Sequence, residues 1–165
     1  MNFNILICFF YVIIVLGDCM TNKEKNEQYM VLMSRLKRAV EGEFYYEAIF
    51  IEYAILEDRA ESLLKHAKLP LYDEFDRPLN LNSKLNSIKH SSKFNMDDYV
   101  KKHITKDLIS KVHTWKNRRN KLIHDLVESN YYDEQIMAIA LEGYDIVKLL
   151  NSKSALVNKY FDKTY

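Results

Sequence analysis

Apolar positions recur at helical spacing along most of the chain. Between Thr21 and Val40 they return every three or four residues, which predicts a helix, and Gly42 ends it. Glu43 to Ala67 repeats this spacing over a broader apolar arc, as expected of a helix at the centre of a bundle. Both prolines of the chain fall within Lys68 to Leu81, which predicts an irregular connection.

The second half of the chain continues the helical pattern. We expect a short helix around residues 85–88 and a longer helical stretch from Asp98 to Val127, with a break near Ile104-Thr105. The last long helix is expected from Tyr131 to Asn151. Ser154 to Phe161 then adds a further turn or two.

Composition supports a single helical domain. A chain of 165 residues has the length of one ordinary domain, and 48% hydrophobic with 13% aromatic residues can supply its core. Three glycines and two prolines are too few for the many turns of an all-β chain. The sequence therefore predicts an all-α fold, an antiparallel four- to five-helix bundle, with a single domain over residues 20–165.

Residues 1–19 form a hydrophobic leader that allows three interpretations. The apolar run from Ile5 to Leu16 is shorter than the about 20 residues that a helix needs to span a bilayer. It has the length of a signal-peptide core, but Met1 to Asn4 lack the expected positive charge. Translation starting at Met20 is the third interpretation. We favour a cytoplasmic domain behind a vestigial or mis-called leader, with membrane tethering or secretion as the alternative.

Several chemistries lack their sequence signatures. The two cysteines, Cys8 and Cys19, both lie in the leader, so the rest of the chain has neither a disulfide framework nor a thiolate metal site. The three glycines are isolated and form no phosphate-binding loop. The histidines do not have the spacing of a metal cluster. We therefore predict neither a cofactor nor a bound metal.

Charge is unevenly distributed although the formal net charge is only +1. Residues 41–76 contain ten acidic and three basic side chains, whereas residues 84–124 contain three acidic and eleven basic ones. A segregated chain of this kind can present a basic surface to nucleic acid despite a neutral total. The alternative is a set of ordinary solvated helix faces.

A short motif lies within the basic segment. The sequence reads RNKLIH from Arg119 to His124, with Asn120 directly after the arginine. This run resembles the R-x4-6-H motif of the HEPN domain family, in its R-N-x-x-x-H form. The acidic and aromatic stretch from Glu52 to Leu64 is similar to the helix that precedes the motif helix in bacterial HEPN proteins. The resemblance extends over Glu43 to Leu150 and implies a HEPN-like helical bundle.

The resemblance implies a metal-independent endoribonuclease, of the kind found in toxin–antitoxin or phage-defence systems. His124 would transfer protons in general acid/base catalysis, because imidazole titrates near neutral pH. Arg119 would stabilise the phosphorane, because guanidinium is forked and permanently charged. These two residues are about 140° apart around a helix. HEPN ribonucleases combine two such pairs in one cleft by dimerisation. Asn120 would orient the His124 ring or hold a phosphate.

The resemblance also implies partners and supporting residues. Lys116, Arg118 and Lys121 would hold the RNA backbone, a salt-sensitive contact without sequence information. Glu57 or Asp58 would be the acid that supports the site. The expected partners are RNA, a second copy of the chain, and an antitoxin or other regulator protein; a membrane is expected only if the leader is retained.

The same residues allow structural alternatives. Arg119 could be a solvated base or an ion-pair partner of Glu57 or Asp58, and His124 could cap the end of its helix. Trp115 is expected in the core rather than as a base-stacking platform. Two other functions therefore stay open: a non-catalytic HEPN-like module that binds RNA or a partner protein, and a membrane- or envelope-associated helical protein that keeps its leader.

Overall fold

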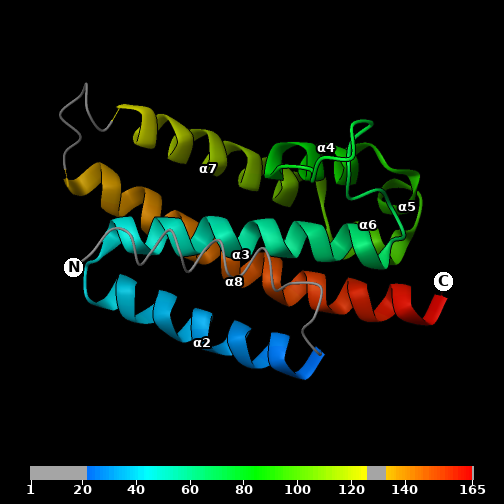
Figure 1. Cartoon of the computed structure of the whole chain (residues 1–165), viewed down its shortest axis with the longest axis horizontal. Coiled ribbons are helices and arrows are strands. Elements are labelled where there is room, and N and C mark those ends of the chain that lie inside the picture. Colours follow the sequence, from blue (N-terminus) through cyan, green and yellow to red (C-terminus); the bar gives the residue numbers. More distant parts are fainter. Residues whose placement is uncertain (1–21, 126–132, 165) are drawn as a thin grey trace. The chain divides into compact units, whose positions relative to one another are not determined.

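The computed structural model describes residues 22–125 and 133–164, and these residues form an all-helical fold (Figure 1). They contain seven helices and no strand, with one isolated bridge between Tyr72 and Pro78 in the irregular connection. The predicted all-α class is thereby confirmed for the described part of the chain. The predicted leader over residues 1–19 lies outside the described residues.

The chain divides into two compact units, Met1–Arg35 and Leu36–Tyr165. In the first unit the described residues are the start of helix α2 (Asn22–Glu41), where Met30 and Val31 are exposed. The remaining turns of α2 belong to the second unit. The predicted end at Gly42 is confirmed, but the residue with a left-handed backbone there is Glu43, with φ of 60°.

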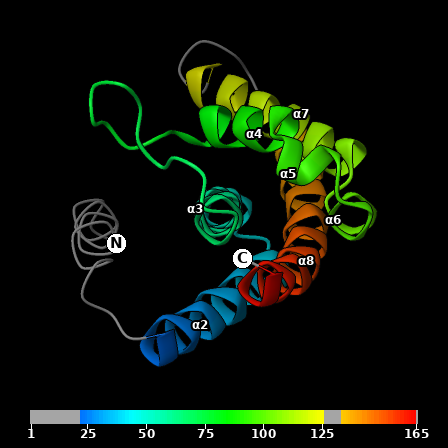
Figure 2. The same cartoon turned by 90° about the vertical axis from the view of Figure 1, so that its right-hand side faces the viewer.

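Helix α3 (Tyr45–His66) is the central element of the second unit, packing against α4 (Leu81–His90), α7 (Lys106–Asp125) and α8 (Asp133–Thr164). Figure 2 views α3 almost end-on, with α4 and α7 above it and α8 beside it. Buried side chains lie on several sides of α3, so its broad apolar arc is explained by three neighbouring helices.

The predicted antiparallel arrangement holds for some helices, but it is wrong for α3 and α8, the two helices that share the largest contact. In Figure 1, α7 runs opposite to both α3 and α8. Helices α3 and α8 run parallel, because partners advance together along both: Ser62 accepts a hydrogen bond from Asn158, and His66 contacts Asp162 four residues further on. Helix α7 carries the chain back along both helices, so α8 can run in the same direction as α3.

The predicted break near Ile104-Thr105 is confirmed. Helix α6 (Asp98–His103) ends there, and α7 begins at Lys106. Both starts are capped by side chains: Asp97 accepts the backbone N–H of Val100, and the Thr105 hydroxyl accepts that of Leu108. Between α4 and α6 lies one further turn of helix, α5 (Ser92–Asn95).

The last helix is longer than expected. Helix α8 continues without interruption to Thr164, whereas the sequence pattern predicts an end near Asn151 and a separate turn from Ser154. No glycine or proline stands between these positions, and Ser154 is itself buried, so the apolar face simply continues. The predicted entry to this helix at Tyr131 lies outside the described residues.

The prediction that Trp115 lies in the core is confirmed. Its side chain is fully buried, and its indole N–H donates to the backbone carbonyl of Ile139 at 2.9 Å, which ties α7 to α8. Among residues 22–125 and 133–164, we find no helix with the length and apolar character needed to cross a bilayer.

Replacing Gly143 by Ala should destabilise the second unit. A Cβ at this position would overlap a Glu52 carboxyl oxygen and lie 2.6 Å from the Trp115 indole nitrogen. Relieving this overlap requires movement of tightly packed side chains, at a cost of about 1–3 kcal/mol. Urea unfolding measures the loss, and Ser152→Ala on the exposed side of α8 is the control. Equal stability of the two variants would contradict this close packing.

Candidate functional site

Arg119 lies on the side of α7 that faces α3. Its guanidinium carbon is 4.5 Å from the ring centre of Tyr53 and 5.2 Å from that of Phe50. One guanidinium nitrogen also donates to the side-chain oxygen of Asn120 at 3.2 Å. Two aromatic rings, one turn apart on α3, therefore support the flat cation and restrict its position.

The charge of Arg119 is not paired with a carboxylate within the described residues, although the charge of Glu57 acts on it. Burial lowers the pKa of Arg119, whereas the nearby Tyr53 and Glu57 raise it. A guanidinium is too basic to lose its proton in a protein, so Arg119 stays cationic. Within the described residues it forms no ion pair with a carboxylate, and its Nε has no hydrogen-bond partner. Because Nε is buried, an anion can reach only the terminal N–H groups of the guanidinium.

His124 lies apart from Arg119. It is exposed in the last turn of α7, whereas Arg119 is half-buried against α3. The five-residue spacing directs the two side chains about 140° apart. Asn120 directly follows Arg119 in the sequence and lies one turn before His124 on the same side of the helix. It is therefore the predicted site residue that lies next to both Arg119 and His124. The structure brings Arg119 and Asn120 together and leaves His124 outside this contact.

The three bases predicted to hold RNA have different surroundings. Lys121 is exposed to solvent. Arg118 is paired at the surface with Glu142 of α8. Lys116 is only 7% exposed and donates to the side-chain oxygen of Asn82 at 2.7 Å, and burial lowers its pKa. Lys116 therefore joins α7 to α4, and the exposed bases of this set are Arg118 and Lys121.

Of the two predicted supporting acids, Glu57 lies closer to the site. Its charge acts on both Arg119 and Tyr53, because it raises the pKa of each. Glu57 also lies 3.5 Å from the Nζ of the buried Lys84. Asp58 instead pairs with the adjacent Arg59. The predicted ion pair between Arg119 and either acid is not formed within the described residues.

Sequence reasoning missed the most unusual acid of the molecule, Glu52. Its side chain is fully buried, and neither carboxyl oxygen has a hydrogen-bond partner within the described residues. Burial raises the pKa of Glu52 to about 9, so the carboxyl is neutral at pH 7. A signal was available, because Glu52 is four residues from both Ala48 and Leu56, which are buried positions of α3.

The aromatic rings beneath Arg119 were also missed as site residues. Phe50 and Tyr53 were assigned to the apolar arc of the second predicted helix, and both are in fact half-buried. Their three-residue spacing places them side by side on one face, which is a signal that sequence alone provides. Sequence alone does not show which helix packs against that face.

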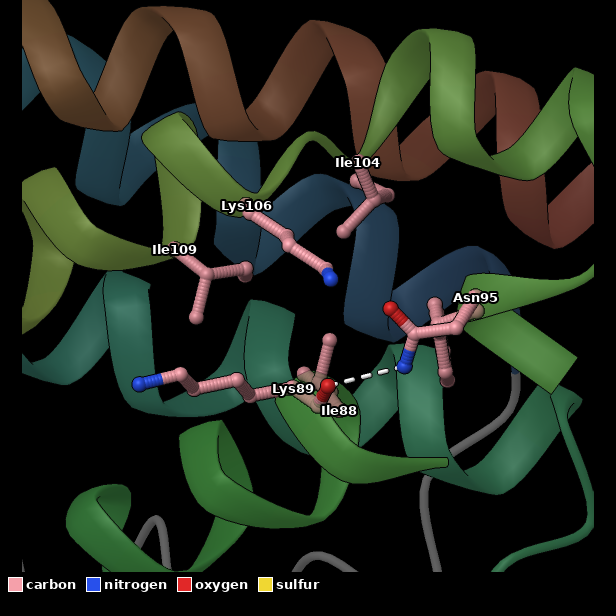
Figure 3. Close-up of a pocket in the computed structure, with 7 residues that line it drawn as sticks. Ile88, Lys89, Asn95, Ile104, Lys106 and Ile109 are labelled. Atoms are coloured by element: carbon pink, nitrogen blue, oxygen red, sulfur yellow. Dashed lines mark hydrogen bonds between the residues drawn. The ribbon is translucent and has the colours of Figure 1, made fainter. Parts of the chain in front are cut away.

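A small hollow lies away from these residues, where α4, α5 and α7 meet (Figure 3). Ile88, Ile104 and Ile109 form its apolar lining, and Asn95 donates a hydrogen bond to the backbone carbonyl of Lys89 beside it. Its volume of about 10 Å³ has room for one water molecule. We therefore do not count it as part of the candidate site.

Comparisons with known proteins give no independent identification. No family model, no curated protein and no solved structure matches the chain. In the described part of the chain, no three histidine, cysteine or acidic side chains gather in an arrangement that could hold a metal ion.

The buried carboxyl of Glu52 should make stability depend on pH. Its pKa is about 9 in the folded protein against 4.5 for an ordinary glutamate. The unfolded chain therefore ionises first, so the contribution of Glu52 to stability is fully present below pH 4.5 and is lost as the pH rises towards 9. Glu52→Gln lacks this ionisation. Its free energy of unfolding, relative to that of the parent, should therefore rise by on the order of 2–4 kcal/mol between pH 5 and 8.

Urea unfolding at several pH values measures this effect. Glu74→Gln, a change at an exposed acid of the irregular connection, serves as the matched control and should keep the pH dependence of the parent. Parallel stability curves for Glu52→Gln and the parent would show that the carboxyl is not buried in the neutral form.

Proposed function

We propose that the protein is a metal-independent endoribonuclease of the HEPN type, active as a homodimer in the cytoplasm. The observation that carries the proposal is the half-buried guanidinium of Arg119, held over Phe50 and Tyr53 without a carboxylate partner in the described residues. A fixed cation without a paired carboxylate suits the anionic phosphorane of RNA cleavage. Asn120 accepts a hydrogen bond from Arg119 and belongs to the same motif as His124.

The proposed reaction divides the work between the two motif residues. The 2′-oxygen of a ribose attacks the adjacent phosphorus, and the bond from phosphorus to the 5′-oxygen breaks. The products are a 2′,3′-cyclic phosphate and a free 5′-hydroxyl. His124 accepts the proton of the 2′-hydroxyl or donates one to the departing 5′-oxygen. Arg119 stabilises the additional negative charge on the phosphorane oxygens.

The dimer is part of the proposal for a geometric reason. Arg119 is directed towards α3, whereas His124 lies exposed at the end of α7, so one chain does not direct both groups at one phosphate. A second copy that brings its own motif to the same cleft supplies two histidines, one as base and one as acid. The exposed Lys121, and Arg118 once released from Glu142, would hold the RNA backbone there.

The test is cleavage of a mixed RNA pool by the full chain in the presence of EDTA. We expect the parent to cut RNA, and His124→Ala to reduce the rate by about 10²-fold or more. Arg119→Ala should cost about 10²–10³-fold, and Arg119→Lys should recover little, because an ammonium lacks the planar fork. The products should end in cyclic phosphates.

Matched controls distinguish loss of chemistry from loss of structure. His90→Ala removes an exposed histidine from α4, and Arg38→Ala removes an exposed arginine from α2. Both should cleave RNA at the parental rate. Equal rates for the motif variants and these controls would exclude the assigned roles, and a parent that leaves RNA intact would exclude the ribonuclease.

A second candidate function has its own supporting observation. Arg119 is supported by α3 and lies away from His124, an arrangement that also suits a non-catalytic HEPN-like module. Such a module would bind RNA, or a partner such as an antitoxin or another regulator protein, through the cation. Binding of RNA that Arg119→Ala weakens, combined with the absence of cleavage, would establish this alternative. Unchanged binding on that substitution would exclude the RNA-binding form.

A further inference from the structure

A cluster of three rings lies near the C-terminal end of α8, apart from the candidate site. Tyr99 of α6 stacks on Tyr160 of α8, with ring centres 4.7 Å apart and planes 25° from parallel. His103, one turn after Tyr99, lies 4.7 Å from the Tyr99 ring centre. Tyr99 is nevertheless 40% exposed, unlike the core aromatics.

A hydrogen bond to Asp97 and the packing of two buried phenylalanines hold the cluster in place. The Tyr160 hydroxyl donates to Asp97 at 2.6 Å, and the same carboxylate caps the start of α6. This hydrogen bond lowers the pKa of Asp97, so the acceptor stays ionised near neutral pH. Below the cluster, the buried rings of Phe94 and Phe161 pack edge to face at 5.5 Å. Tyr99 and Tyr160 are therefore placed in advance of any binding event.

Two lysines lie near the partly exposed Tyr99. Lys102 lies three residues after Tyr99 on α6, and Lys153 lies seven residues before Tyr160 on α8, so each is on the same side of its helix as that tyrosine. Burial lowers the pKa of His103, and the charges of Lys153 and Lys102 lower it further. Lys102 is exposed and Lys153 is half-exposed. In contrast, Lys101 of the same helix is paired with Asp98. Two lysines thus flank an exposed stacked tyrosine.

We propose that this surface binds single-stranded RNA, with a nucleobase stacked on Tyr99 and the neighbouring phosphates held by Lys102 and Lys153. Aromatic faces bordered by lysines are the usual means of binding single strands without sequence preference. The inference rests on the proposed RNA substrate. It adds a second contact, on α6 and α8, besides the one at Arg119 on α7.

The test is the affinity of the full chain for a fluorescein-labelled 2′-O-methyl oligoadenylate of about 15 nucleotides. This probe lacks the attacking 2′-hydroxyl, so binding is measured without cleavage. Tyr99→Leu should weaken binding about fivefold to a hundredfold, because one base–aromatic stack is lost. Tyr99→Phe keeps the ring and should bind as the parent does. Phe44→Leu, at an exposed aromatic residue elsewhere, is the control and should also bind normally.

The lysines provide an independent measurement. Replacing both Lys102 and Lys153 by Gln should weaken binding and reduce the dependence of affinity on salt concentration, because phosphate contacts release counterions. Thermal unfolding identifies any variant that has lost its fold. Tyr99→Phe must lose affinity little and Tyr99→Leu strongly while thermal unfolding shows both variants to be equally folded, because loss of the stack on Tyr160 could otherwise explain the difference.

The possible results separate this inference from the proposed activity. Equal affinities of Tyr99→Leu and the parent would overturn the stacking surface while leaving cleavage at the motif intact. Absence of any binding by the parent would overturn it as well. Tyr99-dependent binding by a chain that does not cut RNA would support the surface and exclude the ribonuclease.

Discussion

The close approach of α3 and α8 at Gly143 determines where the other groups of the second unit can lie. The Glu52 carboxyl and the Trp115 indole both occupy the space that a larger residue at this position would fill. Trp115 in turn binds the α8 backbone at Ile139, which fixes α7. Because Arg119 follows Trp115 by one turn, this packing also brings its guanidinium over the rings of α3.

Acidic and basic side chains pair inside the molecule as well as at its surface. The acidic α3 lies against the basic segment, and the buried Lys84 of α4 contacts both Glu57 and Glu61 of α3. Lys116 is also buried, but its partner is the uncharged side chain of Asn82. Part of the charge segregation in the sequence therefore serves contacts between helices. The remaining bases, including Lys121 and Lys102, are the ones available to an anionic partner.

Two kinds of aromatic environment follow from the same fold. Phe50 and Tyr53 lie beneath a cation, where their ring faces stabilise Arg119. Tyr99 and Tyr160 instead stack on each other, with Tyr99 partly exposed and a lysine on the same side of each helix. A nucleic acid offers both phosphates and flat bases, so the two arrangements are compatible with one RNA strand as their common partner.

The sequence by itself determined the local features: the helical class, the break before Thr105, and the burial of Trp115. Each depends on neighbours within about one helical turn, through apolar spacing or side-chain caps. It also identified Arg119, Asn120 and His124 as candidates, since a motif is a local pattern. Tertiary structure alone decided that α3 and α8 run parallel, that Lys116 is buried, and that Glu52 is neutral in the core. These features depend on which distant helices pack together, and helical periodicity carries no information about the neighbour that a polar side chain will meet.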